Sequence, residues 1–332
     1  MRVWEQKHEP PFHPWGFESN QMYTWRGLPT IFGNPICDTN EECDYKRIVQ
    51  YSPDRDEWIN IGEAMFSRRF FDLIPVPAEF CDNFIAPGSK VAEESKYQPY
   101  NLLPPLEAPK QMTGQNAALI IGGFTQFGED PRVSDVVELF GCDGVETDTI
   151  ALAPFPKDTY LPAGAHWMEN GKHMIAVCGG YHCFDNACAL ERECYTYSPE
   201  TNTWDNSMAN LVMPRYAHFM HLMPNLNTSD PNDENLSVYG YHLETEIYDH
   251  LGSGQWEIYF NKTDRVFSVD CVVYNEDDGY IYAIANQVIR IDPQTGDGRV
   301  LTTPPEALLR PGRCAKATIN GMPGLLTRWG FW

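Results

Sequence analysis

The chain has 332 residues, and 42% of them are hydrophobic, which is enough to bury a sizeable core. Its formal net charge of −22, without clusters of Lys and Arg, argues against a nucleic-acid-binding face. No apolar run in the sequence approaches the roughly 18 residues of a membrane-spanning helix. Pro (26), Gly (25), Tyr (17) and Phe (17) are plentiful and scattered, which predicts many short strands joined by turns.

The sequence contains an internal repeat, and its first copy begins at residue 32. Residues 32–58 (FGNPICDTNEECDYKRIVQYSPDRDEW) align with residues 178–204 (CGGYHCFDNACALERECYTYSPETNTW), and both segments end in YSPxxxxW. The matched positions are Gly33 with Gly179, Cys37 with Cys183, Tyr51 with Tyr197, and Trp58 with Trp204. A match over so many spaced positions indicates two copies of one structural unit.

Weaker copies follow along the chain, at 117–124 with 133–140, 235–242 with 245–256, 279–286 with 287–296, and 323–332. Each copy predicts an apolar strand ending in glycine, a polar loop, a second strand ending in an aromatic residue, and a third strand beginning near Trp. Fourth strands are predicted at 68–76, 163–169 and 213–223. Four short strands in units of roughly 45 to 60 residues are typical of propeller blades.

This pattern resembles the kelch repeat of β-propellers, which combines an apolar strand, a diglycine, a spaced Tyr and Trp, and a later R-x-x-H. The third copy matches it in full, and the others match in part. The residues that carry the resemblance are Gly33, Tyr51, Trp58, Arg68 or Arg69, Gly122, Gly123, Gly179, Gly180, Tyr197, Trp204, Arg215, His218, Gly240 and Trp256. Phe140 replaces the Tyr of the second copy, and the fifth copy lacks the Trp.

The resemblance implies an all-β, single-domain propeller, and six glycine markers predict six blades. We expect blades at 22–111, 112–168, 169–229, 230–274, 275–318 and 319–332. The last segment supplies only an inner strand, so residues 1–21 are expected to complete that blade and remove the open edges of the ring. The longest insertion, 77–116, is either an ordered arm or a tolerated surface loop.

Four cysteines cluster in the third copy, and within a blade their positions predict two nested disulfides, Cys178–Cys194 and Cys183–Cys188. Cys37 and Cys43 repeat the inner pair. A zinc site is the rival, but the spacings depart from the usual C-x₂₋₄-C pairs, and free buried thiols are a further alternative. Cys81 with Cys142 is an additional candidate pair, and Cys271 and Cys314 stay unassigned.

The ten cysteines suit an oxidising compartment, and Asn227, Asn235 and Asn261 each begin an N-x-[ST] glycosylation acceptor. We therefore expect a secreted, extracellular glycoprotein. The first residues lack the apolar region of a secretory signal, so that signal would precede this numbering; a cytosolic chain is the alternative.

No catalytic, cofactor-binding or metal-ligating set emerges from the sequence. His218 and His221 could hold copper as in the galactose oxidase group of kelch-like propellers, but His218 fills the R-x-x-H position and His221 would point to the opposite face. Acidic loops at 38–43, 229–235 and 275–279 could hold calcium, although none has EF-hand spacing.

These observations predict a non-catalytic kelch propeller that acts as a structural or recognition module. Its expected partners are proteins, glycans or further copies of itself, without nucleic acid and without a membrane span. A copper-radical oxidase of the galactose oxidase kind and an intracellular kelch adaptor are the alternatives.

Overall fold

The computed structural model describes residues 21–25, 28–37, 43–85, 117–127, 130–142, 149–184, 187–224, 234–239, 245–248, 254–260, 271–275, 278–284, 287–293, 295–302, 314–319, 322–327 and 330–331. The chain divides into two compact units by its internal contacts. Unit 1 comprises 1–160, 198–204 and 315–332, and unit 2 comprises 161–197 and 205–314.

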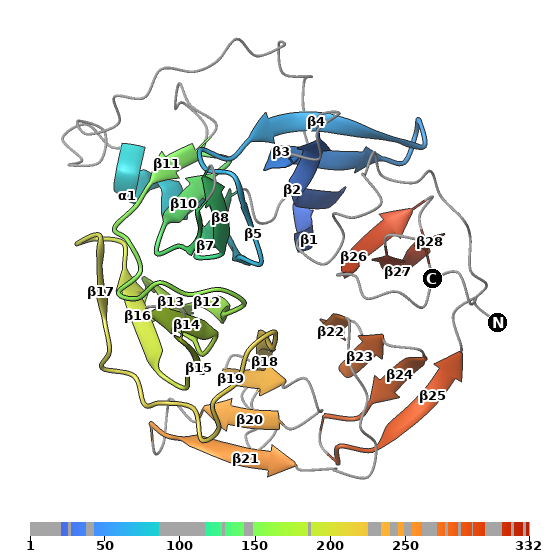
Figure 1. Cartoon of the computed structure of the whole chain (residues 1–332). Coiled ribbons are helices and arrows are strands. Elements are labelled where there is room, and N and C mark those ends of the chain that lie inside the picture. The colour runs from blue at the N-terminus through green and yellow to red at the C-terminus, as the bar shows by residue number, and fades with distance from the viewer. Residues whose placement is uncertain are drawn as a thin grey trace. The chain divides into compact units, whose positions relative to one another are not determined.

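Unit 1 contains two four-stranded antiparallel sheets within its described residues (Figure 1). The first runs in chain order through β1 (Gln21–Trp25), β2 (Leu28–Cys37), β3 (Cys43–Ser52) and β4 (Glu57–Glu63). The second has the order β6 (Asp72–Val76), β7 (Ala117–Ile121), β10 (Val137–Phe140) and β11 (Thr149–Ala151).

Smaller elements accompany these two sheets. A three-stranded sheet joins β5 (Arg68–Arg69) to the hairpin of β8 (Phe124–Phe127) and β9 (Asp130–Val133). A 3-10 turn, η2 (Ala78–Cys81), and the short helix α1 (Asp82–Ile85) follow β6. A further three-stranded sheet contains β26 (Cys314–Ile319), β27 (Met322–Thr327) and β28 (Gly330–Phe331).

Three more four-stranded sheets begin in unit 2 (Figure 1). The third sheet runs through β12 (Ala163–Glu169), β13 (Lys172–Cys178), β16 (Cys194–Ser198) and β17 (Thr203–Asp205), with a hairpin of β14 (Tyr181–Phe184) and β15 (Ala187–Leu190) between β13 and β16. The fourth has β18 (Phe219–Pro224), β19 (Glu234–Tyr239), β20 (Thr245–Tyr248) and β21 (Trp256–Phe260). The fifth has β22 (Cys271–Asn275), β23 (Tyr280–Ile284), β24 (Val288–Ile291) and β25 (Gly298–Thr302).

Successive sheets pack face to face within each unit. The first strands of neighbouring sheets contact one another, β1 with β6 in unit 1, and β12 with β18 and β18 with β22 in unit 2. Trp25, Phe32 and Ile48 of the first sheet form one buried cluster with Ile120 and Phe140 of the second. Meanders that stack through their first strands and their apolar faces are the arrangement of propeller blades. The prediction of an all-β, propeller-like protein is confirmed.

The strands group into sheets differently from the prediction. The strands expected to close a blade instead open the following sheet, so β6, β12 and β18 pair with β7, β13 and β19. The physical reason is plainest at β12 and β13, which are joined by the tight turn of Asn170 and Gly171, both with positive φ. Such a turn forces two adjacent strands into one antiparallel hairpin.

The C-terminal segment also differs from the expected single inner strand. It forms three strands. Residues 314–319, most of which were expected in the fifth blade, pair with residues 322–327 instead. The six-blade count and its closure remain predictions, because residues 1–20 lie outside the described part of the chain. Most of the insertion 77–116 lies outside it as well, since the described residues stop at Ile85 and resume at Ala117.

The polar loop predicted after each apolar strand is a hairpin in the third sheet. Strands β14 and β15 extend directly from the diglycine, and the backbone register places Cys183 opposite Cys188. In the first sheet β2 and β3 extend in the same way, with Cys37 opposite Cys43. The repeat therefore includes a hairpin arm.

Candidate functional site

The diglycine of the third sheet brings the predicted kelch positions together. Gly179 has a φ of +67°, and a Cβ on it would lie 2.6 Å from the Arg215 carbonyl oxygen and 2.8 Å from the His218 ring. The next residue, Gly180, donates its N–H to the same carbonyl at 2.8 Å. His218 is 1% exposed. A side chain at residue 179 would separate the strand from the segment that crosses to the next sheet.

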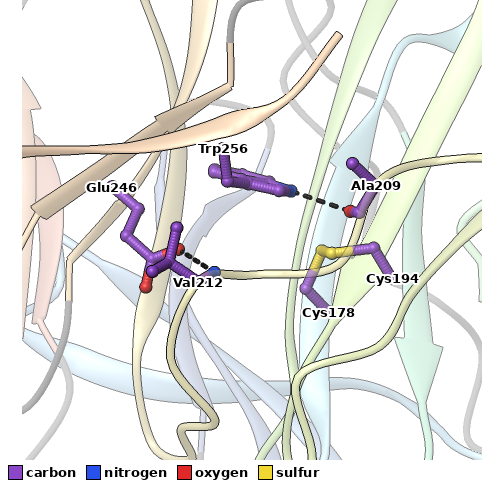
Figure 2. Close-up of a disulfide and its surroundings, with 6 residues drawn as sticks. All are labelled: Cys178, Cys194, Ala209, Val212, Glu246 and Trp256. Carbon is purple, nitrogen blue, oxygen red and sulfur yellow. Dashed lines mark hydrogen bonds between the residues drawn. A yellow bond between two sulfur atoms is a disulfide. The ribbon is translucent and has the colours of Figure 1, made fainter.

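Arg215 belongs to the segment 209–215, which runs between the third and fourth sheets and is called here the second crossover. Its guanidinium forms a buried ion pair with Glu246 of β20. The same carboxylate accepts the backbone N–H of Val212 at 2.7 Å (Figure 2), and it also accepts the backbone N–H of Met213 at 3.2 Å. Three donors therefore surround one buried carboxylate, which satisfies the charge that burial would otherwise penalise.

The same arrangement recurs in unit 1 at residues 64–68, the first crossover. Arg68 pairs with Glu138 of β10, and Glu138 also accepts the N–H groups of Met65 at 2.6 Å and Phe66 at 3.3 Å. Arg68 donates further to the carbonyls of Gly122 at 3.1 Å and Val136 at 2.6 Å. The structure thus assigns the repeat position to Arg68.

Burial lowers the pKa of Arg68, and the charge and hydrogen bond of Glu138 oppose that change. The neighbouring Arg69 lies over the rings of Phe70 and Phe124, at 5.4 and 5.3 Å from their centroids. The two consecutive arginines therefore have different environments, one in a buried ion pair and one against aromatic faces.

Two of the repeated tryptophans hydrogen-bond to the backbone of connecting segments, and Trp256 does so at the second crossover. Trp256 is 5% exposed and donates its indole N–H to the carbonyl of Ala209 at 3.0 Å (Figure 2). Trp204 makes the equivalent bond to Ala153 at 3.0 Å and meets Phe155 edge to face. Each indole therefore combines its packing with a directional hydrogen bond to the backbone.

Two predicted disulfides are present among the described residues. Cys178 and Cys194 lie opposite each other on β13 and β16 with a Cα–Cα distance of 4.1 Å, and both are fully buried beside the second crossover (Figure 2). Cys81 and Cys142 are bonded with a Cα–Cα distance of 5.6 Å. This second bond fastens η2 to the end of β10.

The structure describes the other six cysteines only in part. Cys188 is disulfide-bonded, and the backbone register sets it opposite Cys183, its predicted partner. The side chain of Cys183 lies outside the described residues, so the bond between the two stays a prediction. The side chains of Cys37, Cys43, Cys271 and Cys314 lie outside the described residues. Their pairing remains a prediction.

The two candidate copper ligands have separate neighbours. His218 packs against Gly179, whereas His221 on β18 lies 3.2 Å from the carbonyl of Val272 on β22. In the calcium candidate at 275–279, Asp278 accepts the N–H of Tyr280 at 3.2 Å and the hydroxyl of Tyr282 at 2.5 Å. Both oxygens of that carboxylate thus stabilise the turn between β22 and β23.

Among the described residues, no group of three His, Cys, Asp or Glu side chains is placed so that it could hold a metal ion. Within the same ranges, no helix is long and apolar enough to cross a membrane. The sequons Asn227 and Asn261 lie outside the described residues, as does Gly240. Asn235 lies on β19 opposite Met223.

Exposed apolar side chains occur beside the second crossover. Leu190 at the end of β15 is 42% exposed, and Val212 and Met213 are 42% and 40% exposed. Backbone bonds from Arg215 to Glu191 and from Leu211 to Arg192 hold the two segments together. We call Leu190, Val212 and Met213 the crossover surface.

The fold and these contacts define an all-β protein with a propeller-like arrangement of blades. Comparison with known proteins finds no family model that matches the chain and no significantly similar curated protein.

Proposed function

We propose that the chain is a secreted kelch-type propeller that works as a non-catalytic structural and recognition module, binding a protein or glycan partner. The observation that carries this proposal is the bracing at the second crossover. There a buried ion pair, an indole hydrogen bond and a buried disulfide converge on one connecting segment. A scaffold braced in this way holds its surface in one conformation, which lowers the entropy lost on binding.

The kelch assignment is supported by the contacts of its repeat positions. The diglycine, Arg215 and His218 touch one another, and Tyr248 packs against Trp256 with a centroid distance of 5.3 Å. Tyr51 and Trp58 repeat this pairing at 5.3 Å in the first sheet. The residues that the repeat spaces along the sequence therefore meet in space.

Secretion is supported by the oxidised cysteines. Disulfides persist in extracellular and periplasmic compartments, whereas glutathione and thioredoxin keep cytosolic thiols reduced. A cross-link such as Cys81–Cys142, with a sequence separation of 61, restricts the unfolded chain over a long loop.

Recognition is assigned to the crossover surface. Glu246 holds the backbone of Val212 and Met213, and Leu190 precedes Glu191, whose carbonyl accepts the N–H of Arg215. Loops positioned by a rigid scaffold are where binding residues concentrate.

The test uses the purified, oxidised protein in two binding assays, sedimentation velocity for self-association and a glycan array for carbohydrate. We expect saturable binding in one of them, weakened at least tenfold by the double substitution Leu190→Glu/Met213→Glu. The matched control is Val300→Glu/Leu301→Glu, which adds the same charge at the exposed strand β25 and is expected to leave binding unchanged.

Absence of binding in both assays would overturn the recognition proposal. Equal weakening by the two double substitutions would show that charge, rather than the crossover surface, controls binding. Release of hydrogen peroxide from primary alcohols by the copper-loaded protein would favour the oxidase alternative instead.

A further inference from the structure

A pair of histidines lies on the first hairpin of the third sheet, away from both crossovers. His166 is on β12 and His173 is on β13, and the turn at Asn170 and Gly171 joins the strands. The Nε2 atom of His166 faces the Nδ1 atom of His173 at 3.0 Å, and the ring centroids are 5.3 Å apart. The two imidazole nitrogens thus face each other in one hydrogen bond.

A methionine shares their face of the hairpin. The register sets Met168 directly opposite His173, and Met168 is two residues from His166 on the same strand. Side chains opposite each other or two apart on a strand lie on one face, with Cβ atoms of opposite residues about 5 Å apart. Met168 is 52% exposed, whereas Ala163, Ala165 and Trp167, on the other face, are buried in the core. The thioether can therefore reach the histidine pair from solvent.

Imidazole binds a metal through a ring nitrogen that carries no proton. In the hydrogen-bonded pair one facing nitrogen carries the proton. That proton can move to the other nitrogen of its own ring, so both facing lone pairs become available without net proton loss.

We propose that His166, His173 and Met168 form a copper-binding site. With metal–nitrogen bonds of about 2.0–2.1 Å, nitrogens at a 90° ligand angle are about 2.9 Å apart, and at a tetrahedral angle about 3.3 Å. The observed separation of 3.0 Å is that of the hydrogen bond between the rings and lies between these two values, so a rotation of the rings would let both nitrogens bind one ion. Imidazole suits both copper oxidation states, and the soft thioether favours Cu(I).

This inference is independent of the proposed function, because it requires neither secretion nor a binding partner. It also differs from the copper site considered at His218 and His221, which have separate neighbours. The proposed site has two histidines and one thioether, so it is compatible with the lack of any three-membered His, Cys, Asp or Glu group in the described residues.

The experiment is a copper titration of the chelator-treated full chain, with Cu(II) followed by electron paramagnetic resonance and Cu(I) by competition with a chromogenic chelator. We expect one copper per chain, with hyperfine splitting from two nitrogens. His166→Asn and His173→Asn should each weaken Cu(II) binding at least tenfold. Met168→Leu should weaken Cu(I) binding more than Cu(II) binding.

Matched controls separate the site from adventitious binding. His182→Asn on β14 changes a histidine elsewhere in unit 2, and this variant should bind copper as the wild type does. Diethylpyrocarbonate labelling of the wild-type chain avoids any folding defect, and copper should protect His166 and His173 but not His182. Unprotected histidines, or copper binding unchanged in His166→Asn, would overturn the proposal.

Discussion

Replacing Arg215 with Met is expected to lower the free energy of unfolding by about 3 to 5 kcal/mol. Glu246 is fully buried, and its carboxylate would keep the N–H groups of Val212 and Met213 but lose its counter-charge. Methionine retains most of the aliphatic volume, so the effect measures the unpaired charge more than a cavity. Urea unfolding followed by tryptophan fluorescence gives the value.

Two variants control for this effect. Arg192→Met removes an exposed guanidinium near the same crossover and should change stability by less than about 0.5 kcal/mol. The double variant Arg215→Met/Glu246→Leu removes both charges and should recover part of the loss, because apolar replacements of a buried pair are often tolerated. A stability of Arg215→Met within about 1 kcal/mol of the wild type would contradict the bracing role of the ion pair.

Replacing Gly179 with Ala is expected to lower the free energy of unfolding by about 2 to 5 kcal/mol. The backbone there has a φ of +67°, which costs a non-glycine residue about 1–2 kcal/mol. The new Cβ would also lie 2.6 Å from the Arg215 carbonyl oxygen, and relieving such an overlap costs about 1–3 kcal/mol more. Thermal unfolding of the purified variants measures the sum.

Gly171 provides a matched control for the backbone contribution. It has a φ of +75°, but a Cβ there would meet no atom within 4 Å. Gly171→Ala should therefore cost only the conformational part, about 1–2 kcal/mol. Equal losses in the two variants would show that the contact with the second crossover contributes nothing.

The sequence was sufficient to predict the strands but not their grouping. The repeat located β2, β7, β13 and β23 because each is an apolar run of strand length beside a glycine. The grouping depended on which turns are tight. The sequence E-N-G-K at residues 169–172 is a strong hairpin signal, and it would have paired β12 with β13 in advance.

The acidic partners of the two arginines were missed although a local signal exists. Glu138 and Glu246 each lie two residues before the aromatic residue of their strand, at Phe140 and Tyr248. At the corresponding position before Tyr197 the residue is Tyr195, which hydrogen-bonds to Glu193 instead. Each glutamate lies in the repeat copy that follows its partner arginine, Arg68 or Arg215. A comparison of the copies for such arginine–glutamate pairs would have identified both glutamates.

The histidine pair could not be predicted from spacing alone. His166 and His173 are seven residues apart, and that interval brings them together only if the strands turn at Asn170 and Gly171 in the observed register. A shift of one residue would move one imidazole to the opposite face of the sheet. The disulfide Cys178–Cys194 was predictable because its two cysteines flank a single loop of one repeat.

Non-reducing peptide mapping of the alkylated protein by mass spectrometry is the most direct test of a propeller braced by oxidised cysteines. Our account predicts that the bonds found include Cys178–Cys194 and Cys81–Cys142, beside those predicted for Cys183–Cys188 and Cys37–Cys43. Alkylated thiols at these four positions, or a bond between Cys178 and Cys183, would contradict it.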